Sequence, residues 1–201
     1  MPFVAERFVT ARESKKTASV GDVFLNASSL KDGETVRTSP VGDSSLDLYE
    51  VWGRTSEGKP KCLRFAEEPT GAELQQRAAD EGVALVDQRG EPSRLKQALA
   101  FWVWDYSTSR VRLFYASQAT ILDTLAALFS DEDVSKDPGT WDFELSRTGT
   151  GMDTRYSVVL KPGRRKGAVA AEVSDAWQEC VKAGYNLEAL LTGGDPTKMP
   201  F

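Results

Sequence analysis

The sequence predicts a mainly β protein with accessory helices, of the α+β class, whose strands curl into a closed or partly open barrel. Two hairpin patterns and one helix between them support this prediction. The strands are rich in aromatic and β-branched residues. The second turn contains Gly149 and Gly151, and glycine can adopt backbone angles that other residues resist. The first hairpin joins residues 98–106 to 110–115, the helix covers 118–129, and the second hairpin joins 141–147 to 154–161.

Composition limits the classes of function. The chain of 201 residues is long enough to bury a core and favours one elaborated domain. It has no histidine, and its two cysteines, Cys62 and Cys180, are too few for a disulfide framework or a zinc site. We therefore expect no catalytic residues, no metal and no cofactor. The net charge of −5 argues against a uniformly basic nucleic-acid binder but permits a local basic groove.

Targeting signals are not evident in the sequence. No apolar run approaches the ~20 residues that a membrane helix needs, and the start Met1–Arg7 lacks the basic and apolar blocks of a signal peptide. We expect a protein that has no membrane partner and stays in the compartment where it is made.

The N-terminal part reads as an arm followed by a strand meander. Within residues 1–20 the large apolar groups are Phe3 and Phe8, and residues 11–19 are polar, so we expect a flexible arm or one that docks on a neighbour. Pro40 and Gly42 are expected to end the second strand of the meander. The expected strands are 23–25, 34–39 and 46–52.

An insertion at about 53–97 interrupts the domain predicted over 21–166. Thr70 and Glu73 have the spacing of a capping box for a helix over 71–81, which Gly82 would end. The helix is too short and polar to form a core alone.

Two further helices are expected after the first hairpin. Ser117 is the expected N-cap of the helix over 118–129, whose apolar stripe would plug the barrel. The domain is followed by a C-terminal helix and tail over 167–201, with the helix at about 168–183.

Aromatic residues and arginines occur together on the predicted strands, a combination that suits binding to single-stranded nucleic acid. Aromatic faces stack on bases while cations contact phosphates, and each stack contributes about 1–3 kcal/mol without reading sequence. The alternative is that these tryptophans are core residues. Both faces of 98–106 are apolar, so one face is core and the other is covered or used. Arginines on such strands need a carboxylate or phosphate partner unless water solvates them.

Enzyme signatures are missing. Gly149 and Gly151 precede a strand instead of a helix, so this turn does not match a phosphate-binding loop. Asp105 and Asp153 lie next to turns, where side-chain capping explains them better than catalysis.

Three segments of the chain carry a resemblance to a known family. They are residues 24–37, the strand at 102–105, and residues 141–158 with their Arg-x-Gly-x-Gly turn. In this order they resemble bacteriophage single-stranded DNA-binding proteins related to the T-even phage helix-destabilising protein. The resemblance implies an OB-fold-like five-stranded barrel that holds single-stranded DNA in a groove during phage DNA replication, recombination and repair in the host cytoplasm. The candidate DNA-binding residues are Arg37, Trp52, Arg54, Trp102, Trp104, Arg112, Arg147, Arg155, Tyr156 and Lys161.

The chain departs from this family in two places. Family members often carry a zinc-binding segment in the insertion, whereas here only Cys62 remains of such a ligand set, so the insertion should fold without metal. The acidic tail is also reduced. However, Met199, Pro200 and Phe201 resemble the Pro-Phe terminus with which bacterial single-strand-binding proteins recruit replication enzymes.

Partners and alternatives follow from these features. We expect single-stranded DNA as the main partner, with phage replication proteins at the C-terminal tail, and we leave self-association open. A different hypothesis is an OB-type interaction subunit of a phage replication or transcription complex that binds DNA weakly or not at all. A metal-dependent nuclease ranks below both.

Overall fold

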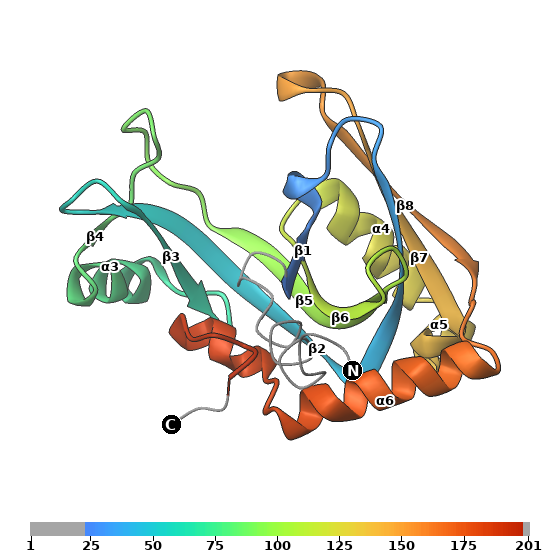
Figure 1. Cartoon of the computed structure of the whole chain (residues 1–201). Helices are drawn as coiled ribbons and strands as arrows, with labels where there is room; N and C mark the ends of the chain where they lie inside the picture. Colours follow the sequence, from blue (N-terminus) through green and yellow to red (C-terminus); the bar gives the residue numbers. More distant parts are fainter. Residues whose placement is uncertain (1–22, 199–201) are drawn as a thin grey trace, which may run out of the picture.

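The computed structural model describes residues 23–198. The expected arm over 1–20 and the tail residues Met199, Pro200 and Phe201 lie outside the described residues. The described chain is mixed α+β and mainly β, with one open sheet of eight strands (Figure 1). The strands are β1 Phe24–Asn26, β2 Thr35–Thr55, β3 Pro60–Phe65, β4 Val83–Ala84, β5 Lys96–Asp105, β6 Arg110–Ala116, β7 Trp141–Thr148 and β8 Arg155–Pro162. The α-helices are α3 Gly71–Asp80, α4 Ala119–Phe129, α5 Glu132–Lys136 and α6 Ala168–Lys182, and the 3-10 helices are η1 Ala27–Ser29, η2 Pro138–Thr140, η3 Gly151–Asp153 and η4 Leu187–Thr192.

The main path of the sheet runs β1-β6-β5-β2-β7-β8, and β3 and β4 also pair with β2. Only the β1–β6 pair is parallel among the described strands. Both expected hairpins are confirmed as β5–β6 and β7–β8. The path ends at β1 and β8, so these pairings do not show a closed five-stranded barrel.

Strand β2 is one long strand where the sequence predicted two, so the prediction that Pro40 and Gly42 end a strand is wrong. A β-bulge between Pro40 and Ser45 shifts the register against β5, and pairing resumes beyond it. The bulge accommodates the proline, which still lies opposite Val103, and Gly42 adopts a φ of 74° there. β2 therefore carries the chain from β7 at one end to β3 and β4 at the other (Figure 1).

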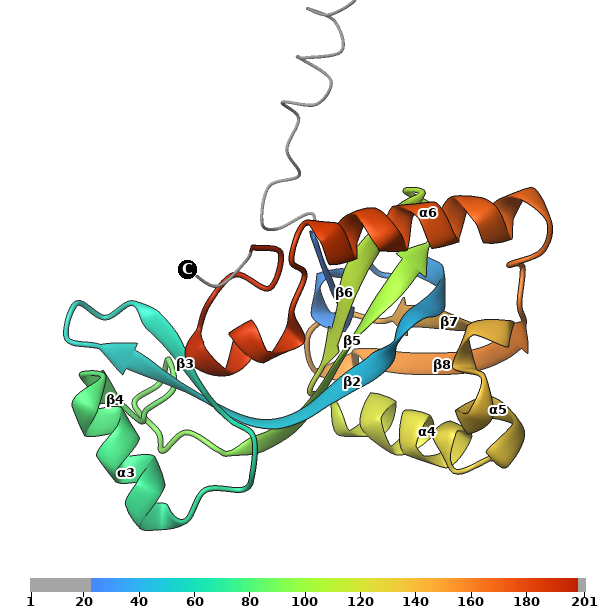
Figure 2. The ribbon, with the colours of Figure 1, turned by 90° about the horizontal axis from the view of Figure 1, so that it is seen from below.

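Helices cover opposite faces of the curled sheet. Helix α4 packs on one face, where Ile121 and Leu125 are buried with Phe101 and Phe143. Helix α6 and η4 cover the other face (Figure 2), so the two apolar faces predicted for β5 are both buried. None of the helices within residues 23–198 is long and apolar enough to cross a membrane.

The insertion packs in a small cluster that it shares with β2, and Ala78 is the only buried residue that α3 contributes to it. Val51 of β2, Leu63 of β3 and Ala78 of α3 are buried together. The capping box of α3 is confirmed, since Thr70 accepts from the Glu73 backbone and the Glu73 side chain accepts from the Thr70 backbone. The prediction that Ser117 caps α4 is wrong, because Gln118 occupies the N-cap position without a side-chain hydrogen bond.

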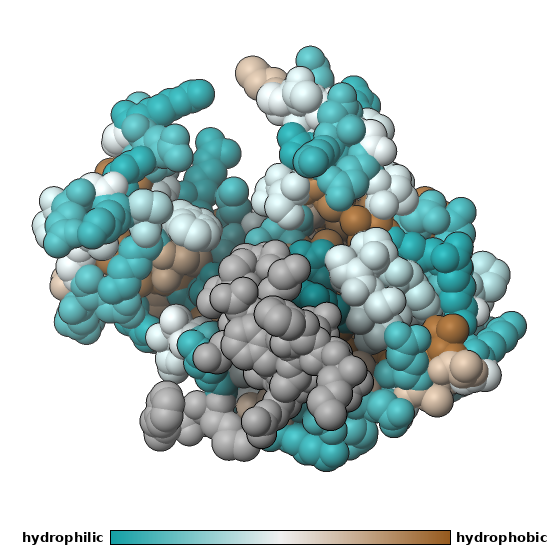
Figure 3. Space-filling view, in the orientation of Figure 1, coloured by the Kyte–Doolittle hydropathy of each residue, from teal (hydrophilic) through white to brown (hydrophobic). Residues whose placement is uncertain are grey.

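Figure 3 shows a wide notch between the insertion and the β7–β8 hairpin, with mostly hydrophilic residues on its walls. The two walls are the connection from β2 to β5 and the connection from β7 to β8, which rise on the same side in Figure 1. Each of these two connections begins and ends at a strand of the sheet.

Candidate functional site

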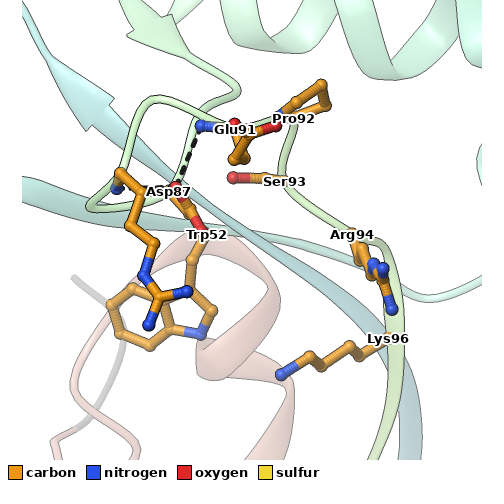
Figure 4. Close-up of a pocket in the computed structure, with 8 residues that line it drawn as sticks. Trp52, Asp87, Glu91, Pro92, Ser93, Arg94 and Lys96 are labelled. Atoms are coloured by element: carbon orange, nitrogen blue, oxygen red, sulfur yellow. Dashed lines mark hydrogen bonds between the residues drawn. The ribbon is translucent and has the colours of Figure 1, made fainter.

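A cleft of about 710 Å³ opens beside Trp52, where β2 and β5 separate. The β2–β5 ladder ends at the pair Glu50–Lys96. Two residues further along β2, Trp52 faces Cys62 of β3 on one side and has no β5 partner on the other. The cleft is lined by Trp52, Asp87, Arg89, Glu91, Pro92, Ser93, Arg94 and Lys96 (Figure 4).

Trp52 offers an exposed flat ring in this cleft. Its exposed fraction is 48%, and every other tryptophan between residues 23 and 198 is buried or half-buried. In Figure 4 the Lys96 side chain extends toward the indole. An exposed aromatic ring beside cations suits stacking with a base whose phosphate lies nearby.

The loop that carries the cations is held by Asp87. Its Oδ1 accepts hydrogen bonds from the backbone N–H groups of Arg89 at 2.7 Å and Glu91 at 3.0 Å. These bonds lower the pKa of the Asp87 carboxyl, so it stays ionised and keeps the loop shape at neutral pH. Arg54 donates to the Asp87 carbonyl and to the Gly58 carbonyl, and it thus joins the loop to β2.

The positive charge of Arg89 helps to lower the pKa of Asp87, but the cleft's three cationic side chains are otherwise available. Within residues 23–198, no ion pair or hydrogen bond engages the side chains of Arg89, Arg94 or Lys96. Ser93 adds a hydroxyl oxygen that is buried at the cleft without a hydrogen-bond partner in this part of the chain. Three cations face two carboxylates here, and the Asp87 carboxylate is already used by its own loop. The cleft is therefore suited to an anionic ligand with a flat ring.

The prediction that Trp102 and Trp104 stack on bases is wrong. Each has an exposed fraction of 2% in the core beneath α6 and η4. The ring of Trp102 lies 4.8 Å from that of Tyr185 and 6.3 Å from that of Trp177, measured between centroids. The C-terminal helix covers this apolar face.

Three of the predicted arginines bind acceptors of the protein. Arg37 pairs with Asp142 at 2.8 Å, and Arg112 pairs with Asp105 at 3.0 Å. Arg147 donates to the carbonyls of Ser28 and Leu30, which lie in the segment that follows β1. These guanidinium groups hold strands and loops together and do not line the cleft.

The remaining candidates are spread over the β7–β8 hairpin. Arg155 is exposed, Tyr156 packs against the core beneath α4, and Lys161 lies 4.0 Å from the carboxylate of Glu144. The tip of this hairpin carries Met152, whose side chain is fully exposed. Of the ten predicted residues, the structure thus brings Trp52 and Arg54 to the cleft region.

The sequence pattern did not point to Arg89, Arg94, Lys96 or Ser93. They occupy a stretch of mixed charge before β5, which reads as an ordinary linker. The spacing of Arg94 and Lys96 just before a strand was the available signal. Among residues 23–198, no group of three or more cysteine, aspartate or glutamate side chains is placed to hold a metal ion.

Comparison with models of known protein families finds no match, and comparisons with curated proteins and with solved structures find none either.

Proposed function

We propose that this chain binds single-stranded DNA without sequence preference, and that the strand lies across the cleft beside Trp52. The observation that carries the proposal is an exposed indole surrounded by the three unpaired cations Arg89, Arg94 and Lys96. This combination permits base stacking together with phosphate contacts, neither of which reads sequence. The cleft replaces the groove that was expected over Trp102 and Trp104.

The connectivity of the sheet supports an OB-related arrangement. Strands β2, β5 and β6 form a meander, α4 follows, β7 returns to pair with β2, and β8 pairs with β7. An OB-fold has this order of elements in a partly open barrel, and its oligonucleotides contact the first and last interstrand loops. Those loops correspond here to the connection from β2 to β5, which holds the cleft, and to the β7–β8 turn.

The biological setting is also part of the proposal. A sequence-independent single-strand binder serves phage DNA replication, recombination and repair in the host cytoplasm, where exposed strands need protection. No catalytic step is assigned to the chain.

A fluorescence titration tests the proposed function. The full chain is titrated with an unstructured oligothymidylate at low and at moderate salt while tryptophan emission is followed. We expect saturable quenching that weakens with salt, because bound cations displace counterions from the strand. Absence of quenching and of any mobility shift at both salt concentrations would instead favour the protein-interaction subunit without DNA binding.

A further inference from the structure

We propose that a second site, at the bulge of β2, binds a nucleoside monophosphate. The bulge opens a cavity of about 310 Å³ between β2 and β5, within the size range of small-ligand pockets. A second cleft of about 520 Å³ adjoins it, since Gly42, Asp43, Ser135 and Pro138 line both.

The cavity suits a flat heteroaromatic ring. Its apolar lining includes Leu99 and Phe129 together with Phe101 and Trp102, which are almost fully buried. The ring of Phe129 is half-buried and stands 6.2 Å from that of Phe101 between centroids. Ser44 and Ser45 at the rim are exposed and provide hydroxyl groups for the ring edge.

From the cavity to the outer cleft, the lining changes from apolar to polar to cationic side chains, which matches the base, sugar and phosphate of a nucleotide. Asp43 and Ser135, which line both hollows, are exposed acceptors and donors suited to sugar hydroxyls. Lys136 and Arg165 line only the outer cleft and supply positive charge for a phosphate. Base, sugar and phosphate would therefore lie in sequence from the cavity outward.

Charges in the outer cleft are balanced without the ligand. Asp137 also lines it, and Lys136 pairs with Glu132 at 2.9 Å. Arg165 donates through Nη1 to the carbonyl of Pro40 at 2.7 Å, which fixes the bulge next to the cavity. We infer moderate affinity that depends on ring and phosphate together.

Titration calorimetry of the full chain with AMP, adenosine, dAMP and inorganic phosphate tests this site. We expect saturable AMP binding, adenosine binding about tenfold weaker because the charged hydrogen bonds are lost, and no binding of phosphate alone. We also expect AMP to bind better than dAMP, because Asp43 accepts a hydrogen bond from a ribose hydroxyl. Absence of saturable AMP binding, or equal affinity for AMP and adenosine, would overturn the proposal.

Matched variants separate this site from the cleft beside Trp52. Lys136→Glu should weaken AMP binding about tenfold, whereas Lys182→Glu should leave it unchanged, since Lys182 is an equally exposed cation paired with Glu179 on α6. Ser44→Phe should fill the rim of the cavity and abolish binding, and thermal unfolding checks that each variant is folded. Loss of AMP binding in Trp52→Ala would place AMP in the other cleft and overturn the proposal. Displacement of AMP by a 5′-phosphorylated oligonucleotide identifies the terminal nucleotide of a strand as the ligand, and retention of AMP identifies the free nucleotide.

Discussion

Arg37 donates a 2.8 Å hydrogen bond from Nε to the carboxylate of Asp142, and the Asp142 side chain has no exposed surface. The same carboxylate accepts from the hydroxyl of Tyr106 at 2.9 Å and from the backbone N–H of Arg164 at 3.1 Å. A single buried charge thus connects β2, the β5–β6 turn, β7 and the segment after β8. An arginine predicted to contact DNA instead stabilises the sheet.

Replacing Asp142 by alanine should lower the free energy of unfolding by about 3–5 kcal/mol, because it leaves the Arg37 charge without its buried partner. Urea unfolding followed by circular dichroism measures the change. Lys182→Ala, which removes an exposed ion pair with Glu179, should cost less than about 1 kcal/mol. Equal losses in the two variants would show that the buried pair has no special role.

Tyr106 should make stability fall at alkaline pH. Its burial, together with the hydrogen bond to Asp142, raises the pKa of its hydroxyl to about 12. The unfolded tyrosine ionises near pH 10, so this contribution is complete below about pH 10 and is lost as the pH rises toward 12. In Tyr106→Phe the urea midpoint should decline less steeply from pH 9 to about 11.5. If the urea midpoints of wild type and Tyr106→Phe declined equally over this pH range, Tyr106 would not be a source of the alkaline loss of stability.

Local sequence patterns predicted most strands and helices, whereas long-range packing decided the site. The runs of aromatic and β-branched residues predicted both hairpins, which are β5–β6 and β7–β8 in the structure. The same reasoning could not tell whether Trp102 faces a ligand or a helix, because α6 begins more than sixty residues later. The cleft forms where β5 separates from β2. This separation depends on tertiary structure and cannot be predicted from a local sequence pattern.

Trp52→Ala should weaken oligothymidylate binding by about 5- to 150-fold, which corresponds to one lost stack of 1–3 kcal/mol. Trp52→Phe should retain part of the affinity because a smaller ring remains. Fluorescence anisotropy of a labelled oligonucleotide measures both variants. Val181→Ala on α6, outside the cleft, is the control for removing an exposed apolar side chain. A loss as large in Val181→Ala as in Trp52→Ala would argue against a specific stack.

Arg94→Ala should reduce the salt dependence of binding. Each phosphate contact on a single strand contributes about 0.7 to the slope of log affinity against log salt, so the slope should become shallower by about that amount. Lys182→Ala on α6 should leave the slope unchanged, since Lys182 lies outside the cleft. Identical slopes in wild type and Arg94→Ala would mean that this cation meets no phosphate.

Photocrosslinking locates the bound strand. The full chain is irradiated with an oligonucleotide that carries 5-iodouracil at each position in turn, and the crosslinked peptides are identified by mass spectrometry. Stacking on Trp52 predicts that the main crosslink lies on the β2 peptide containing this residue, whichever bases flank the iodouracil. Efficient crosslinking that never involves Trp52 or residues 87–96 would contradict DNA binding in this cleft.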